Sequence, residues 1–208
     1  MFDYDGVIVD SFDAFVNACM KTAQEFRITT LDSKEAFLRL MEGNVFDTLQ
    51  QQHHIDPERI PQIFTRLLFH LNDTKTPAAP FPHILDTLTA VCHNAHILII
   101  TSNDTNTVGS FLQSQRITCI KEIIGVQEEK SKRKKIQYVK EHFPNTRYLY
   151  IGDTLGDMKE AKDAGVTTVA VSWGWHSEKL LHTIHPDVMV HTPEALTHVL
   201  LQFIEEKS

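Results

Sequence analysis

Residues 2–11 read FDYDGVIVDS, and this stretch decides the fold. Two aspartates, Asp3 and Asp5, lie two residues apart directly after the apolar start of the chain. On a strand both would point to the same face, and Gly6 then lets the chain turn sharply. The carboxyl ends of strands are where open α/β sheets bind ligands. Paired carboxylates in such a turn suit a hard metal ion, or nucleophilic and acid–base chemistry on a phosphoryl group.

Two later stretches repeat the pattern of an apolar strand followed by polar side chains. Residues 147–151, RYLYI, are typical of a buried parallel strand, and GDTLGD follows at 152–157. Residues 97–100, ILII, precede TSN at 101–103, whose hydroxyl and amide groups can hold phosphate oxygens. Each motif alone has a simpler interpretation as a turn or a helix cap. Together, in this order, they predict strand ends that converge on one site.

These motifs resemble those of the haloacid dehalogenase (HAD) superfamily, closest to phosphoglycolate phosphatases and β-phosphoglucomutases, and the resemblance runs nearly end to end. It implies that Asp3 is the nucleophile and Asp5 the general acid and base. It assigns phosphate binding to Thr101, with Ser102 and Asn103 assisting, and to one lysine of the run KSKRKK at 130–135. We favour Lys132, which lies just ahead of the apolar face of the next helix, over Lys130.

The resemblance also implies a bound Mg²⁺ as cofactor. Its ligands would be the side chains of Asp3 and Asp153 and the backbone carbonyl of Asp5. Asp157 would orient a metal-bound water or Lys132, and an acid at a helix start is the competing interpretation of this residue. Asp10 and Ser11 are expected to cap the next helix, and His176 could border the site.

The periodicity predicts an α/β fold with a parallel sheet and a helical insertion after the first strand. The resemblance implies that these are a Rossmann-like core and an inserted all-helical cap. The core would comprise residues 1–11 and 81–208, and the cap residues 12–80. Helices are expected at 12–26, 33–51 and 57–71. Three prolines at 76–82 indicate a stiff hinge. Beyond it helices and strands alternate: helices at 84–92, 107–115, 134–142, 155–164 and 194–204, and strands at 95–101, 120–125, 148–153 and 167–172.

The first strand is unusually short, because only Met1 and Phe2 precede Asp3. In the HAD family this strand lies at the centre of the sheet. If the chain truly starts at Met1, a short central ladder with a cost in stability is expected; a misassigned start and a truncated chain are the alternatives.

Bulk composition limits the classes of function. The chain has 208 residues and a net charge of −7, which argues against a general nucleic-acid surface. Its three cysteines lack metal-ligand spacing, and its apolar runs are far shorter than a membrane helix. No signal peptide precedes the first motif, so we expect a cytoplasmic protein, monomeric or homodimeric, with no membrane or nucleic-acid partner.

The resulting hypothesis is a magnesium-dependent phosphatase acting on a small phosphorylated metabolite through an aspartyl-phosphate intermediate. Phosphoglycolate is the best single guess at its substrate. The presence of Asp5 favours a phosphoester as substrate, because dehalogenases lack an acid at the position of Asp5. A β-phosphoglucomutase-like phosphotransferase is the alternative enzyme, but Phe46 stands where such caps carry a phosphate-binding arginine. A non-catalytic binding domain is the alternative from another class. In the cap, Arg39, Glu42, Asn44 and residues 50–54 could face substrate, or could equally be exposed helix positions.

Overall fold

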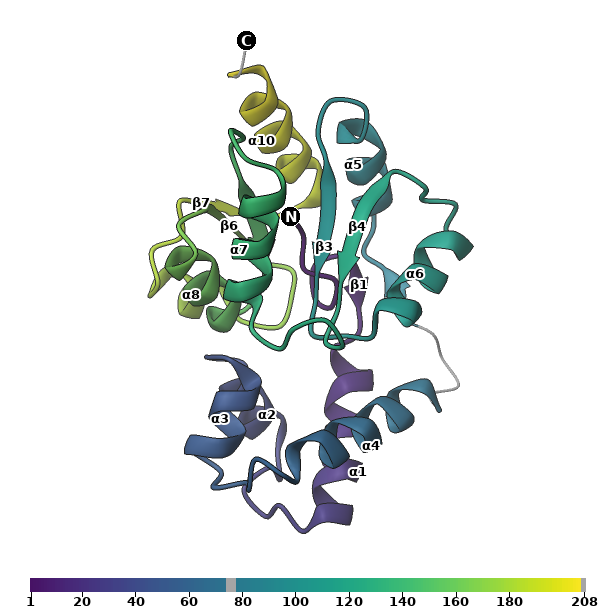
Figure 1. The fold of residues 1–208 in the computed structure, drawn as a ribbon, viewed down its shortest axis with the longest axis vertical. Coiled ribbons are helices and arrows are strands. Elements are labelled where there is room, and N and C mark those ends of the chain that lie inside the picture. The colour runs from purple at the N-terminus through teal and green to yellow at the C-terminus, as the bar shows by residue number, and fades with distance from the viewer. Residues whose placement is uncertain (74–77, 207–208) are drawn as a thin grey trace.

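The computed structural model describes residues 1–73 and 78–206, except the side chain of Asn72. Figure 1 shows a sheet flanked by helices and, below it, a cluster of helices formed by residues that follow the first motif. The strands are β1 (Val9–Asp10), β2 (Ala79–Pro80), β3 (Ile97–Ile100), β4 (Ile120–Ile124), β5 (Leu149–Gly152), β6 (Thr167–Val171) and β7 (Val188–Val190). The helices are α1 (Phe12–Phe26), α2 (Lys34–Leu40), α3 (Val45–Gln51), α4 (Ile60–Asn72), α5 (Ile84–Val91), α6 (Thr105–Ser114), α7 (Lys132–His142), α8 (Leu155–Asp163), α9 (Glu178–His182) and α10 (Pro193–Glu205).

The central position in the sheet is held by Phe2. β3 pairs with β4, and β6 pairs with β5 on one side and β7 on the other, all in parallel. Phe2 forms parallel bridges to Ile99 of β3 and Ile151 of β5, and so joins the two groups into one sheet. Its amide donates to the carbonyl of Leu98 at 2.9 Å. These bridges place Asp3 at the carboxyl ends of β3 and β5.

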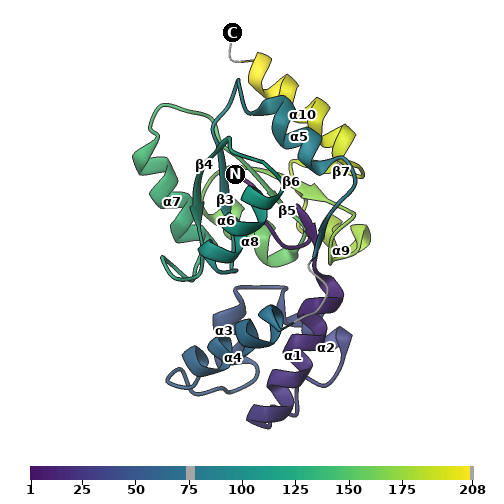
Figure 2. The ribbon, with the colours of Figure 1, turned by 90° about the vertical axis from the view of Figure 1, so that its right-hand side faces the viewer.

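Helices cover both faces of this sheet, which confirms the α/β class. Apolar side chains of α5, α6 and α10 pack on one face, and those of α7, α8 and α9 pack on the other. Figure 2 shows α5 and α10 side by side at the outer end of the molecule. The arrangement is the Rossmann-like three-layer fold that the alternation of helices and strands predicts.

Helices α1–α4 form a cluster with a hydrophobic core of their own. The single helix predicted over 33–51 is wrong: α2 ends at Leu40 and α3 begins at Val45. Asn44 breaks the helix because its side chain accepts hydrogen bonds from the amides of Phe46 and Asp47, which caps a new helix. That Ser33 starts the first of these helices is confirmed, since its hydroxyl accepts from the amide of Ala36.

The two chain crossings between the sheet and this cluster lie side by side. β1 pairs antiparallel with β2, with Val9 opposite Pro80 and Asp10 opposite Ala79. The part of the proline-rich hinge at 74–77 lies outside the described residues, whereas Ala79 and Pro80 form this ribbon. The division into a core and a cap at these crossings stays a prediction.

Several boundaries differ from the sequence expectation for local reasons. α4 begins at Ile60 rather than Pro57, because the Asp56 side chain accepts from the amide of Glu58 in a preceding turn. α7 begins two residues early, at Lys132, because Ser131 caps it. The short elements α9 and β7 were not predicted at all. Within residues 1–73 and 78–206, no helix has the length and apolar character needed to span a bilayer.

Candidate active site

The predicted strand ends meet at one edge of the sheet. Asp3 follows Phe2, Thr101 follows β3 and Asp153 follows β5, and all three side chains are buried. Asp3 and Thr101 line a single pocket with Asp5, Ser102 and Lys132. This convergence follows from parallel strands sharing one carboxyl edge.

Asp3 is held between its own backbone turn and a buried cation. Its Oδ1 accepts from the amide of Tyr4 at 2.8 Å, and its Oδ2 accepts from the ammonium group of Lys132 at 2.6 Å. Burial raises the pKa of Asp3 to about 7, and the charge of Lys132 opposes that shift. Lys132 therefore favours the ionised form, which is the form able to attack phosphorus.

Asp5 has a different environment, made of neutral donors. Its Oδ1 accepts from the hydroxyl of Ser11 at 2.8 Å, and its Oδ2 accepts from the amide group of Asn103 at 3.0 Å. Burial raises the pKa of Asp5 to about 6, and these two hydrogen bonds limit the rise. Ser11 occupies the N-cap position of α1 as expected, but its side chain makes no cap hydrogen bond and binds Asp5 instead.

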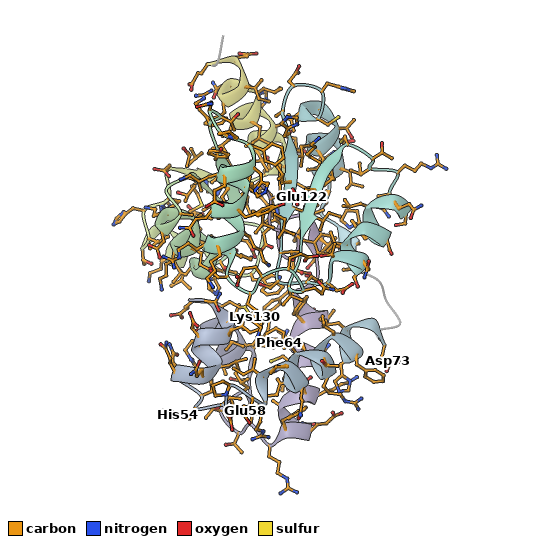
Figure 3. All side chains as sticks on the ribbon, in the orientation of Figure 1. His54, Glu58, Phe64, Asp73, Glu122 and Lys130 are labelled. Atoms are coloured by element: carbon orange, nitrogen blue, oxygen red, sulfur yellow. The ribbon has the colours of Figure 1, made fainter. Side chains whose placement is uncertain are left out.

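The two candidate lysines occupy different places. Lys132 is buried and bridges Asp3 and Asp157, reaching Oδ1 of Asp157 at 2.5 Å. Burial alone would lower the pKa of Lys132, but the two carboxylates hold it well above its ordinary value. Lys130 is exposed, and its ammonium lies 5.1 Å from the centroid of the Phe46 ring. Figure 3 shows Lys130 where the sheet domain meets the helical cluster.

Asp153 completes a group of buried carboxylates. One oxygen each from Asp3, Asp153 and Asp157 lie within 4.8 Å of one another. Oδ2 of Asp153 accepts from the amide of Trp175 at 2.7 Å, whereas its Oδ1 is buried without a hydrogen-bond partner among the described residues. Burial, followed by the nearby Asp157 and Asp3, raises the pKa of Asp153. A carboxylate oxygen that has no hydrogen-bond donor and lies beside other carboxylates is a suitable ligand for a hard divalent cation.

Two glycines surround Asp153 closely. A Cβ atom on Gly6 would lie 2.0 Å from Oδ2 of Asp153, and one on Gly174 would lie 2.3 Å from its Cβ. Gly6 also has a φ of +78°, which favours glycine. The backbone thus encloses this carboxylate on two sides.

Asp157 uses both of its oxygens within the protein. Its Oδ2 accepts from the hydroxyl of Thr154 at 2.8 Å in a capping box that begins α8, and its Oδ1 accepts from Lys132. Burial alone would raise the pKa of Asp157, but Lys132 and Thr154 hold it below its ordinary value. Asp157 is therefore both a helix-start acid and the residue that orients Lys132.

Sequence reasoning missed Lys135. It is buried, and its ammonium donates to the backbone carbonyl of Thr101 at 2.6 Å. Burial, followed by the charge of Lys132, lowers the pKa of Lys135 to about 8. The available signal was its spacing of three from Lys132, which puts both on one face of α7.

Two of the residues named as substrate candidates, Glu42 and Asn44, contact α8, and Asn44 also lines the pocket. The Asn44 side chain donates to Oε1 of Glu160 at 3.0 Å, and Lys159 donates to the carbonyl of Glu42 at 2.7 Å. The amide of Gly156 donates to the carbonyl of Met41 at 3.0 Å. These contacts hold the segment between α2 and α3 against the start of α8.

His176 is buried and also links α8 to α2. Its Nδ1 accepts from the amide of Leu155 at 2.9 Å, and its Nε2 lies 3.0 Å from the carbonyl of Leu38. His176 is not among the residues that line the pocket. Arg39 is exposed and also lies outside that lining.

Comparison with known proteins identifies the family to which the chain belongs. Residues 1–171 match the model of the haloacid dehalogenase-like hydrolases, which covers most of the chain. The chain belongs to the haloacid dehalogenase-like hydrolases. The resemblance drawn from the motifs at Asp3, Thr101 and Asp153 is therefore confirmed.

Individual relatives agree over nearly the full length. The chain is 26% identical to the phosphoglycolate phosphatase of Synechococcus elongatus, covering 99% of this chain and 98% of the relative. It is 24% identical to the pyrophosphatase PpaX of Oceanobacillus iheyensis, covering 91% and 90%. The structure of a predicted phosphatase from Clostridium acetobutylicum superposes with a TM-score of 0.81 at 17% identity, covering 97% and 96%. This last likeness shows the shared fold.

Proposed function

We propose that this HAD hydrolase is a magnesium-dependent phosphatase that cleaves a small phosphomonoester through an aspartyl-phosphate on Asp3. The observation that carries the proposal is the pairing of two buried carboxylates with opposite environments. Asp3 faces the cation of Lys132, and Asp5 faces only neutral donors. Burial raises the pKa of both carboxyl groups, to about 7 for Asp3 and about 6 for Asp5. The adjacent ammonium favours the ionised form of Asp3 and so its role as nucleophile, whereas Asp5, with neutral donors, suits the role of general acid and base.

The carboxylate cluster suits Mg²⁺. Asp3 and Asp153 would hold the ion, and the unpartnered Oδ1 of Asp153 is the atom best placed to serve it. When bound, Mg²⁺ would neutralise phosphate charge that otherwise repels a carboxylate nucleophile. Asp157 would act through Lys132, since both of its oxygens already have donors.

The chemistry then follows from the side chains. A carboxylate oxygen of Asp3 attacks phosphorus, the bond from phosphorus to the ester oxygen breaks, and Asp5 gives its proton to the leaving alkoxide. Asp5, now ionised, takes a proton from the water that attacks the phosphorus of aspartyl-phosphate and frees phosphate. Lys132 and Thr101 would bind the transferring oxygens as charge develops, with Ser102 and Asn103 beside them.

Phosphoglycolate is the first ester to test, because the Synechococcus relative and a second relative from Caulobacter vibrioides carry that name. A mutase would need a second phosphate site. Phe46, at the position where mutase caps carry an arginine, is buried and stacks on Phe64 with ring centroids 4.3 Å apart. This packing favours a phosphatase over a phosphoglucomutase.

The test is phosphate release from a panel that includes phosphoglycolate and several sugar phosphates, with Mg²⁺ or with a chelator. Wild type and Asp3→Asn are compared, and circular dichroism checks that both are folded. Release that requires Mg²⁺ and Asp3 is expected. Conversion of a hexose 1-phosphate without phosphate release would show a mutase instead, and a folded wild type that is inactive on every ester would favour a binding domain.

A further inference from the structure

The pocket at Asp3 continues into the interior of the helical cluster. Its lining joins Asp3, Asp5 and Lys132 to side chains of all four helices α1–α4. The cavity volume is about 100 Å³. We call the part formed by the helical cluster the cap chamber; its lining includes Phe15, Ala23, Phe37, Leu49, Phe64 and Leu67. The cap chamber is therefore where the group beyond the ester oxygen would lie.

The chemistry of the cap chamber is apolar. The described residues that line it on the cap side include no lysine, arginine, histidine or carboxylate. Their polar members are already occupied. Thr22 donates to the carbonyl of Ala18 at 2.8 Å, and the side chain of Asn44 caps α3 and bonds to Glu160.

A charged leaving group would find no partner there. Lys132 is the cation among the described lining residues, and Asp3 and Asp157 already engage it. A carboxylate or second phosphate placed among apolar side chains pays a large desolvation cost unless it is paired. An apolar group gains free energy from the same burial.

We infer that the preferred substrate is a phosphomonoester whose leaving group is small, uncharged and apolar, and is held in the cap chamber. The leaving group must be small, because the whole pocket, phosphoryl site included, has a volume of about 100 Å³, and an apolar cavity of about 150 Å³ in another protein holds one benzene. One neutral acceptor in the leaving group is compatible, because Trp175 lines the pocket and its buried indole N–H has no partner among the described residues. The inference rests on the proposed phosphatase function and narrows its substrate class away from phosphoglycolate.

The first experiment compares kcat/KM of the wild-type protein with Mg²⁺ for ethyl phosphate, butyl phosphate and phosphoglycolate. Butyl phosphate is expected to exceed ethyl phosphate by about tenfold, as burial of two further methylene groups would give. Phosphoglycolate is expected to fall below both. Equal values for the two alkyl esters, or a preference for phosphoglycolate, would overturn the inference while leaving the phosphatase function intact.

A binding measurement separates this inference from the proposed function. Butylphosphonate, ethylphosphonate and phosphonoacetate cannot be hydrolysed as esters. Calorimetric titration with each of them therefore measures the affinity of the cap chamber for its organic group in the absence of turnover. Tighter binding of butylphosphonate in a protein that hydrolyses nothing would refute the phosphatase proposal alone. Tighter binding of phosphonoacetate would refute the cap chamber assignment, whatever the activity.

Two variants on the helical cluster sharpen the result. Met41 lines the pocket near the catalytic edge, and Met41→Lys should reverse the preference between butylphosphonate and phosphonoacetate. Lys21 is exposed on α1, and Lys21→Ala is the matched control that should leave the ratio of the two affinities unchanged. An unaltered ratio in folded Met41→Lys would contradict the assignment.

Discussion

The ammonium group of Lys132 donates a hydrogen bond of 2.6 Å to Oδ2 of Asp3. A lysine at the start of α7 is thereby joined to the first motif across most of the chain. Asp157 holds the same ammonium from the other side. The positive charge of the site thus has a defined position between two carboxylates.

Lys132→Ala should lower kcat by about 10²–10³-fold, as the loss of one preorganised donor to a developing charge does elsewhere. It should also destabilise the fold by about 3–5 kcal/mol, because Asp3 and Asp157 lose a buried partner. Lys130→Ala is the control, since Lys130 is exposed and contacts Phe46. Steady-state kinetics and thermal unfolding measure both. Loss of turnover in Lys130→Ala alone would reverse the assignment of the two lysines.

Mg²⁺ should raise the melting temperature of the wild type, because it binds the folded carboxylate cluster and not the unfolded chain. Asp153→Asn should remove most of that shift, since Oδ1 of Asp153 is the unpartnered oxygen. In chelator, this variant should be at least as stable as wild type, because one of the clustered negative charges is gone. Differential scanning fluorimetry with Mg²⁺ or with chelator tests this; a full Mg²⁺ shift in the variant would exclude Asp153 as a ligand.

The turnover of alkyl phosphates should reach a maximum between about pH 6 and 7 and fall above it, because Asp3, whose pKa is about 7, must be ionised to attack, and Asp5, whose pKa is about 6, must be protonated to act as an acid. p-Nitrophenyl phosphate should lack this fall, since its leaving group needs no proton. Ser11→Ala removes a hydrogen bond that stabilises the carboxylate, so it should raise the pKa and move the fall to higher pH. Identical pH profiles for the two kinds of ester would argue against Asp5 as the acid.

Lys135 should make folding stability depend on pH in the alkaline range. Its pKa is lowered from 10.5 to about 8 in the folded protein, mainly by burial. The unfolded chain therefore binds more protons between these values, and the penalty of the buried charge is full below about pH 8 and disappears towards pH 10.5. The free energy of unfolding of Lys135→Met, minus that of wild type, should thus decrease from pH 7 to pH 10. Urea unfolding at both pH values measures it, and a constant difference would refute the shift.

Gly156→Ala should disturb the junction between α8 and the helical cluster. A Cβ there would lie 2.5 Å from the carbonyl oxygen of Gly43 and 2.9 Å from that of Met41. We expect reduced turnover and faster proteolysis of residues 12–73.

The matched control is Gly109→Ala within α6, whose Cβ would meet Ile123 at 3.8 Å, an ordinary contact. It should gain about 0.5–1 kcal/mol of stability, as the loss of a helical glycine does. Equal behaviour of Gly109→Ala and Gly156→Ala in both assays would show that the junction is not needed.

The sequence by itself determined the order of most strands and helices, although not α9, β7 or the division of residues 33–51 into α2 and α3. It also determined that Asp3, Asp5, Thr101 and Asp153 follow strands. These features are local, because each residue follows an apolar strand, and parallel strands bring their carboxyl ends to one edge. Helix boundaries were less accurate where a side chain competed with the helix. Asn44, for example, ended one helix and started another by bonding to backbone amides.

Only the tertiary structure decided which side chains contact partners that lie far apart in the chain. The run 130–135 left Lys130 and Lys132 as alternatives; the cap at Ser131 sets the helical phase that turns Lys132 and Lys135 towards the sheet. Ser11 could be assigned to Asp5 only once the turn after Gly6 was folded. The cap chamber likewise arises from four helices packed together, and helical periodicity shows that a face is apolar without showing what it encloses.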